Sequence, residues 1–312
     1  RKEVLQHKRR GALIMKKVST YLPSLILSVI LVFLLIISSA ILLVDINISA
    51  SKLKNLAARN DLESKIYTDL NKYYNDKYNT TGIPADVYMN SISNSYLKSV
   101  EEAYIDSAFE ALNGDGKFNV NVPSNKKLNE SIDQFFNDFA DENNYEKDDN
   151  FGLKLRNTKE GAYNTIGSYC DVYKFSAMSN HGVLSKLAKL YSNRLLATAA
   201  ALGATVFIIL LLMLINHKKK ITTLYWCGIS AIISGILGGA PSIYLLAVKY
   251  FDSFSIKQAP VFTAFTSAMY KYTEAFMAVQ MAFIVIGISL VVIYGVTHEK
   301  KKYPDTKPTD IN

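Results

Sequence analysis

Residues 22–44 read LPSLILSVILVFLLIISSAILLV, an uncharged run interrupted only by serines and Pro23. A helix needs about 20 apolar residues to cross the hydrocarbon of a bilayer, so this run is long enough to span it. Water does not reach the backbone there, and a spanning segment must satisfy its own amides by forming a helix. The run therefore predicts a first transmembrane helix.

Three further uncharged runs follow, and the hydrophobic 49% of the chain is concentrated in these four stretches. We expect an all-α integral membrane protein with four transmembrane helices and an extracytoplasmic helical domain between helices 1 and 2. The predicted division is a basic N-terminal segment (1–21), helix 1 (22–44), the extracytoplasmic domain (45–194), helix 2 (195–215), a turn (216–223), helix 3 (224–248), an outer loop (249–274), helix 4 (275–296) and a tail (297–312).

The distribution of charge predicts the orientation of these helices. Residues 1–20 carry seven basic side chains and one acidic one, and the turn 216–223 holds Lys218, Lys219 and Lys220. The domain 45–194 instead holds 18 basic and 21 acidic residues. Because lysine and arginine accumulate on the cytoplasmic side, both termini are expected in the cytoplasm of a multi-pass cell-membrane protein. The formal charge of +8 then points to the lipid bilayer as a partner, and not to nucleic acid.

The N-terminal region leaves two alternatives. A basic start before an apolar run also describes a secretory signal peptide, but residues 22–44 are longer than such a core and lack a clear A-x-A site, which favours a retained anchor. Met15 directly precedes Lys16 and Lys17. Residues 1–14 are therefore either untranslated or part of a longer protein.

Helical spacing of apolar residues predicts a small helical bundle in the extracytoplasmic domain. Four patterns can be traced, at 53–73, 84–112, 128–139 and 163–173, and the acidic stretch 141–150 is expected to be a loop. The first pattern is expected to continue from helix 1 as a stalk. The aromatic residues in these patterns fit core packing better than a carbohydrate- or peptide-binding face, although both interpretations stand.

No pattern for catalysis, a cofactor or a metal is complete. Asn113, Asp115 and Gly116 imitate part of a calcium loop, but Ala111 and Val122 occupy two ligand positions, so a helix-ending turn is favoured. Cys170 and His181 carry no mark of a nucleophile and its base. Phosphate-binding, dinucleotide and nucleophile-elbow motifs are absent from the sequence. We therefore expect no enzyme activity and no cofactor.

Five residues in or near the predicted membrane helices stand out. Gly235 and Gly239 share one helix face and predict close helix packing, either within the chain or in a homo-oligomer or with a membrane protein partner. Pro241 is interpreted as a packing bend, with a hinge as the alternative. Glu274 and Gln280 are the polar groups expected to line a pathway if one exists, because unpaired polar groups are costly in hydrocarbon.

The chain resembles a group of uncharacterised four-helix membrane proteins of Gram-positive bacteria, to which no activity is assigned. Its layout is also similar to that of permeases of the cell-division and macrolide-export type, which place a longer cytoplasmic segment where this chain has the turn 216–223. The motifs that carry the first resemblance are GIPADV at 82–87, YIDSAF at 104–109, CDVY at 170–173 and the run from Lys218 to Ile229.

Two functions follow as expectations. The first is a non-enzymatic envelope protein whose outer helical domain binds a partner or ligand. The second is a transporter or permease component in which helices 3 and 4 line a path.

Overall fold

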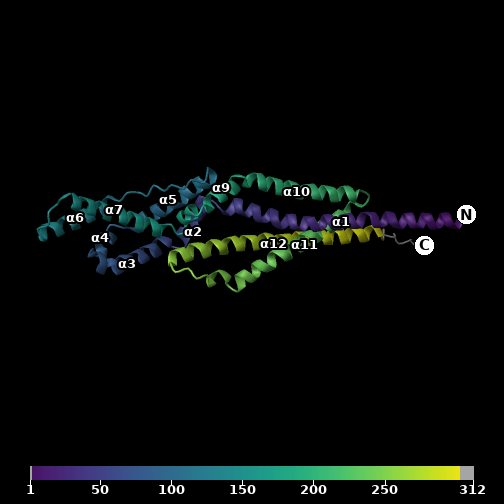
Figure 1. The fold of residues 1–312 in the computed structure, drawn as a ribbon. Helices are drawn as coiled ribbons and strands as arrows, with labels where there is room; N and C mark the ends of the chain where they lie inside the picture. Colours follow the sequence, from purple (N-terminus) through teal and green to yellow (C-terminus); the bar gives the residue numbers. More distant parts are fainter. Residues whose placement is uncertain (1, 303–312) are drawn as a thin grey trace, which may run out of the picture. The chain divides into compact units, whose positions relative to one another are not determined.

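The computed structural model describes residues 2–302, with side chains from residue 20 to residue 299. This part of the chain is all-α, as predicted, and contains twelve α-helices (Figure 1). The expectations about residues 1–14 and the basic side chains of 1–19 and 300–312 lie outside the described side chains.

Four helices are long and apolar enough to cross a membrane, which confirms the prediction of a multi-pass membrane protein. They are residues 20–47 of α1 (Lys2–Asn47), α10 (Arg194–Ile215), α11 (Ile221–Ala247) and residues 259–299 of α12 (Ala259–Lys302). Short 3₁₀ helices, His217–Lys219 and Tyr250–Ser253, follow α10 and α11.

The last of these helices is longer than the sequence indicated. Residues 249–274 are predicted to be an outer loop, yet α12 already begins at Ala259. Lys271 and Glu274 interrupt the hydrophobic run, and this places the start of the apolar stretch at residue 275. The backbone nevertheless stays helical through residues 259–274, since charged side chains on a helix surface do not break its hydrogen bonds.

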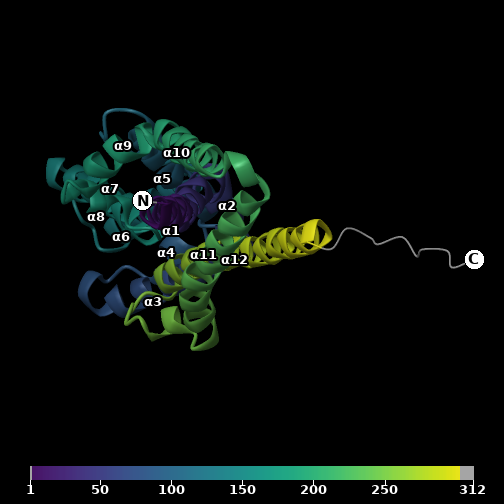
Figure 2. The same ribbon diagram turned by 90° about the vertical axis from the view of Figure 1, so that its right-hand side faces the viewer.

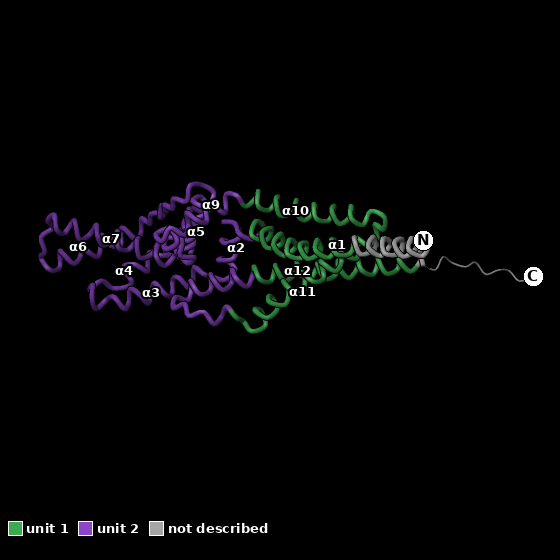
Figure 3. Tube along the Cα trace, turned by 45° about the vertical axis from the view of Figure 1, so that its right-hand side comes forward, with its two compact units in different colours: residues 1–46, 194–250, 272–312 green, residues 47–193, 251–271 purple. Residues whose placement is uncertain are grey.

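The chain divides into two compact units (Figure 3). Unit 1 consists of residues 1–46, 194–250 and 272–312, and unit 2 of residues 47–193 and 251–271. In unit 1, α1 lies between α10 on one side and α11 and α12 on the other (Figure 2). Hydroxyl groups join α1 to each of them: Ser38 to Thr205 of α10, the Ser28 carbonyl to Ser230 of α11, and Ser39 to Gln280 of α12.

Unit 2 is a helical bundle, as predicted, but it holds eight complete helices where four patterns were expected. They are α2 (Ala50–Arg59), α3 (Leu62–Thr81), α4 (Ala85–Met89), α5 (Asn94–Asn113), α6 (Lys126–Glu142), α7 (Asp149–Cys170), α8 (Phe175–Asn180) and α9 (Val183–Ser192). Its core contains fully buried Leu70, Val100, Leu128 and Ile166 from four different helices.

Local capping explains where the expected helices divide. Ser49 accepts a hydrogen bond from the Lys52 amide, which starts α2 anew and separates it from α1, so the expected continuous stalk is interrupted. Asp61 adopts a left-handed conformation between α2 and α3. Ser93 caps α5 through the Tyr96 amide and separates it from α4. The apolar period continues across each break, and therefore it conceals them.

Candidate functional site

Unit 2 has a groove between α3, α4, α6 and α7, which we call the aromatic groove. A larger part of about 630 Å³ and a smaller part of about 310 Å³ share Thr81, Ile83 and Thr158. The other lining residues are Tyr73, Tyr74, Lys77, Thr80, Gly82, Tyr88, Phe135, Phe136, Phe139, Lys154, Asn157, Gly161, Ala162 and Thr165.

Turn geometry and cross-links between helices position the walls of the aromatic groove. Gly82 ends α3 with a φ of +70°, a conformation that glycine adopts without a steric penalty. Helices α6 and α7 are joined by Tyr163, whose hydroxyl donates to the Asn125 carbonyl at 3.1 Å, and by the ion pair of Lys159 with Asp133 at 2.5 Å. These contacts hold the two helices side by side, and the ring of Phe139 on α6 is exposed.

Stacked tyrosines form one wall of the aromatic groove. The rings of Tyr74 and Tyr88 are parallel within 11°, with centroids 4.1 Å apart, and Tyr73 packs edge-on against Tyr74. Burial raises the pKa of Tyr88 to about 12 and also raises the pKa of Tyr74, so both phenols stay neutral. The Tyr74 hydroxyl is buried without a hydrogen-bond partner among the described residues.

Gly161 contributes no side chain to the smaller part of the groove. It lies in the middle of α7, and a Cβ built on it would meet nothing within 4 Å. A glycine inside a helix costs about 1 kcal/mol relative to alanine. Because no neighbour requires a glycine there by close packing, its effect in the folded domain is the absence of a side chain over the groove.

The charge of the aromatic groove differs from that of its domain. Lys77 and Lys154 line it, and none of its lining residues is acidic. The Lys77 ammonium lies 5.8 Å from the centroid of the Tyr73 ring, and Lys154 lies 5.6 Å from that of Tyr145. Residues 45–194 carry more acidic than basic side chains, so the groove is a locally basic surface on an acidic domain.

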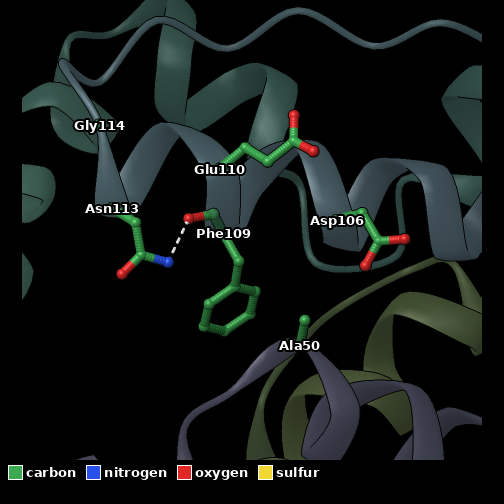
Figure 4. A pocket seen from close by; sticks show the side chains of 6 residues that line it. All are labelled: Ala50, Asp106, Phe109, Glu110, Asn113 and Gly114. Carbon is green, nitrogen blue, oxygen red and sulfur yellow. Dashed lines mark hydrogen bonds between the residues drawn. The ribbon is translucent and has the colours of Figure 1, made fainter.

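A second pocket of unit 2, of about 550 Å³, is lined by residues of α5 and by Ala50 (Figure 4). Two of its polar side chains already have local partners. Asp106 pairs with Lys54 at 2.6 Å, and the Asn113 amide donates to the Phe109 carbonyl at 2.8 Å. Glu110 is exposed. The arrangement offers less for a ligand than the aromatic groove does.

The other residues considered for chemistry are also engaged in structure. Asp115 accepts from the Lys117 amide at 3.0 Å, and Gly116, with a φ of +81°, packs against Ser185. Cys170 is fully buried, with its thiol 3.7 Å from the Leu97 carbonyl, and burial raises its pKa. His181 is exposed at the end of α8. Among the described residues, three or more His, Cys, Asp or Glu side chains do not gather in a metal-binding arrangement.

In unit 1, the structure places Gly235 and Gly239 against α12. A Cβ on Gly235 would lie 2.6 Å from the Gln280 carbonyl oxygen, and one on Gly239 would lie 3.5 Å from the Gln280 Cβ. A Cβ on the neighbouring Gly238 would lie 2.8 Å from the amide carbon of the Gln280 side chain. The glycine face is therefore used within the chain, where it lets two helices approach closely.

The two polar residues expected to line a path are not brought together. Gln280 is completely buried and donates to Ser39 at 2.9 Å, whereas the Glu274 side chain is exposed. The side-chain amide oxygen of Gln280 (Oε1) and the Ser234 hydroxyl have no hydrogen-bond partner within the described part of the chain. Pro241 is exposed, and α11 continues through it to Ala247.

Sequence patterns did not reveal Gly161, Ser39 or Ser234. A lone glycine or serine in a helix carries no signal of its own, although the spacing of Ser234 and Gly238 on one face of α11 could have indicated a polar contact.

No protein-family model, curated protein or solved structure matches the chain. The proposed function is therefore argued from the fold and from the geometry of the groove.

Proposed function

We propose that this multi-pass membrane protein is a non-enzymatic envelope protein whose helical domain lies outside the cytoplasm and binds a partner through the aromatic groove. The observation that carries the proposal is Gly161, which leaves open a groove lined by stacked tyrosines. Aromatic rings supply apolar contact area together with polar edges, a combination that is enriched at recognition surfaces. The orientation rests on the lysines and arginines that flank the membrane helices.

The partner that best fits the aromatic groove is an extended acidic segment of another protein. Lys77 and Lys154 complement carboxylates, while the rings of Tyr73, Tyr88 and Phe135 accept apolar side chains. The Thr80 and Thr165 hydroxyls and the Asn157 amide along the groove can exchange hydrogen bonds with a peptide backbone. The Thr81 and Thr158 hydroxyls already donate to the carbonyls of Lys77 and Lys154 within their helices.

Two labelled peptides of equal length test this assignment. The full chain in lipid nanodiscs is titrated with a peptide of alternating Glu and Leu and with one of alternating Lys and Leu, and fluorescence anisotropy is measured. We expect saturable binding of the acidic peptide alone. Equal binding of both peptides, or binding of neither, contradicts the proposal.

Gly161 and Gly152 provide matched variants in the same helix, since a Cβ on either would meet nothing within 4 Å but only Gly161 lines the groove. Gly161→Trp is expected to weaken binding of the acidic peptide at least about tenfold, whereas Gly152→Trp leaves it unchanged. Gly161→Ala, which adds a single methyl group, should raise the melting temperature and retain binding. Unaltered binding by Gly161→Trp would place the peptide elsewhere.

A further inference from the structure

Unit 1 contains a basic cleft of about 920 Å³ at the turn between α10 and α11, opposite the last turns of α12. Three consecutive lysines and two histidines dominate its lining. The lining residues, which define the basic cleft, are His217, Lys218, Lys219, Lys220, Ile221, Thr222, Leu224 and His298.

The positive charge of the basic cleft is not neutralised by the described side chains that line it. None of the lining residues is acidic, and none of the three lysines forms an ion pair with another described residue. Lys220 is also the residue before the first turn of α11, and no side chain caps that helix end. The amides of the first turn therefore add to the positive potential of the cleft.

A row of aromatic rings adjoins the basic cleft. It runs from Tyr21 of α1 through Trp226 and Tyr225 of α11 to Tyr294 and His298 of α12, with neighbouring centroids 5.2–5.5 Å apart. Trp and Tyr concentrate where headgroups meet hydrocarbon. His298 belongs both to this row and to the cleft, which fits a cleft at headgroup level.

The cleft has an apolar side as well. Ile221 and Leu224 line it beside the lysines, and Leu214, close by at the end of α10, is largely exposed. A small inorganic anion would use only the lysines, whereas a phospholipid would place its phosphate on them and its acyl chains on the apolar side chains.

We propose that the basic cleft binds the phosphate headgroup of an anionic phospholipid. Lys218, Lys219 and Lys220 donate hydrogen bonds to the phosphate oxygens, and Thr222 offers a hydroxyl to the headgroup. Such a lipid would fasten the α10–α11 turn to the end of α12. The site is independent of the aromatic groove, which lies in unit 2.

Thermal unfolding of the detergent-purified full chain tests the site. It is recorded with dioleoyl phosphatidylglycerol, with dioleoyl phosphatidylcholine and with inorganic phosphate, each over the same concentration range. We expect phosphatidylglycerol alone to raise the melting temperature. Equal shifts with the two lipids would show that charge is not recognised, and an equal shift with inorganic phosphate would identify a free anion as the ligand; either result overturns the proposal.

Neutralising the cleft provides the second arm. The triple variant Lys218→Gln, Lys219→Gln, Lys220→Gln should weaken phosphatidylglycerol binding about a hundredfold, given roughly fivefold for each lysine. The control carries the same change of charge at exposed lysines of unit 2, as Lys72→Gln, Lys186→Gln, Lys189→Gln, and should bind like the unaltered chain. A persisting shift in the first variant, or an equal loss in both, would remove the site from this cleft.

Discussion

The Gln280 side-chain amide donates a hydrogen bond of 2.9 Å to the Ser39 hydroxyl, joining two membrane helices across 241 residues of sequence. Ser39 in turn donates to the Ile36 carbonyl at 2.8 Å. The Gln280 side chain has room because Gly238 carries no side chain. A Cβ on Gly238 would lie 2.8 Å from the Gln280 amide carbon. The polar contact and the glycine face therefore depend on each other.

Close backbone approach predicts that alanine is not tolerated at two glycines. In Gly235→Ala the new Cβ would lie 2.6 Å from the Gln280 carbonyl oxygen, and in Gly287→Ala 2.6 Å from the Gly228 carbonyl oxygen. Backbone cannot move aside as a side chain can, so each variant should lose about 1–3 kcal/mol of unfolding free energy. Thermal unfolding in detergent measures this loss. Gly203→Ala, where nothing lies within 4 Å, is the control and should be neutral or slightly stabilising.

Burial predicts how cysteines react in the last helix. In a Cys227→Ser background, in which the remaining Cys170 is fully buried, Gln280→Cys should resist a membrane-impermeant maleimide while Glu274→Cys reacts. The reason is that Gln280 is 0% exposed and Glu274 is exposed. Mass spectrometry of the labelled chain measures the difference. Fast labelling at position 280 would instead favour the transporter alternative, with a water-filled path along α12.

Glu101 predicts a pH dependence of stability. Its side chain is 2% exposed, and burial, followed by the neighbouring Glu63 carboxylate, raises its pKa to about 8. In the unfolded chain a glutamate titrates near 4.3, so between these values the folded chain binds the extra proton. Stability should therefore fall as pH rises from about 4.3 to about 8, by up to roughly 1.4 kcal/mol per pH unit, with no further loss above that window.

Melting temperatures of the full chain across this range test the effect. Glu101→Gln should flatten the decline, whereas Glu110→Gln, exposed on the same helix, should leave it unaltered. An unchanged slope in Glu101→Gln would assign the effect to another group. The groups that interact with Glu101 are Glu63 on α3, Lys98 and Glu102 on α5, Cys170 on α7 and Tyr173 after it.

Asp171 predicts a large loss on truncation. Its carboxylate is buried and accepts hydrogen bonds from the amides of Phe175 at 2.8 Å and Ser176 at 2.9 Å, which starts α8. Asp171→Ala leaves both amides without this acceptor and should cost about 2–4 kcal/mol, measured by thermal unfolding. Asp171→Asn keeps one acceptor oxygen and should lose less. Equal stability of the alanine variant would show that water replaces the carboxylate.

The number of membrane helices could be predicted because each apolar run must form its hydrogen bonds within itself. The start of α12 could not be predicted. Lys271 and Glu274 mark the N-terminal limit of the apolar run, but the helix begins earlier, at Ala259. In unit 2 the apolar spacing correctly predicted helices, but it missed the caps at Ser49 and Ser93 that divide them. The position of a cap depends on one side chain, whereas a period depends on many.

What the sequence alone determined is the class of the protein: four apolar stretches, an all-α domain between the first two, and helix faces that must be buried. Only the tertiary structure decided what meets those faces. It paired Gln280 with Ser39, placed Gly161 beside the stacked tyrosines, buried Glu101 near Glu63 and brought His298 to the three lysines. Periodicity shows that a side chain is covered, but the covering group comes from a distant segment, and its identity depends on how the helices pack.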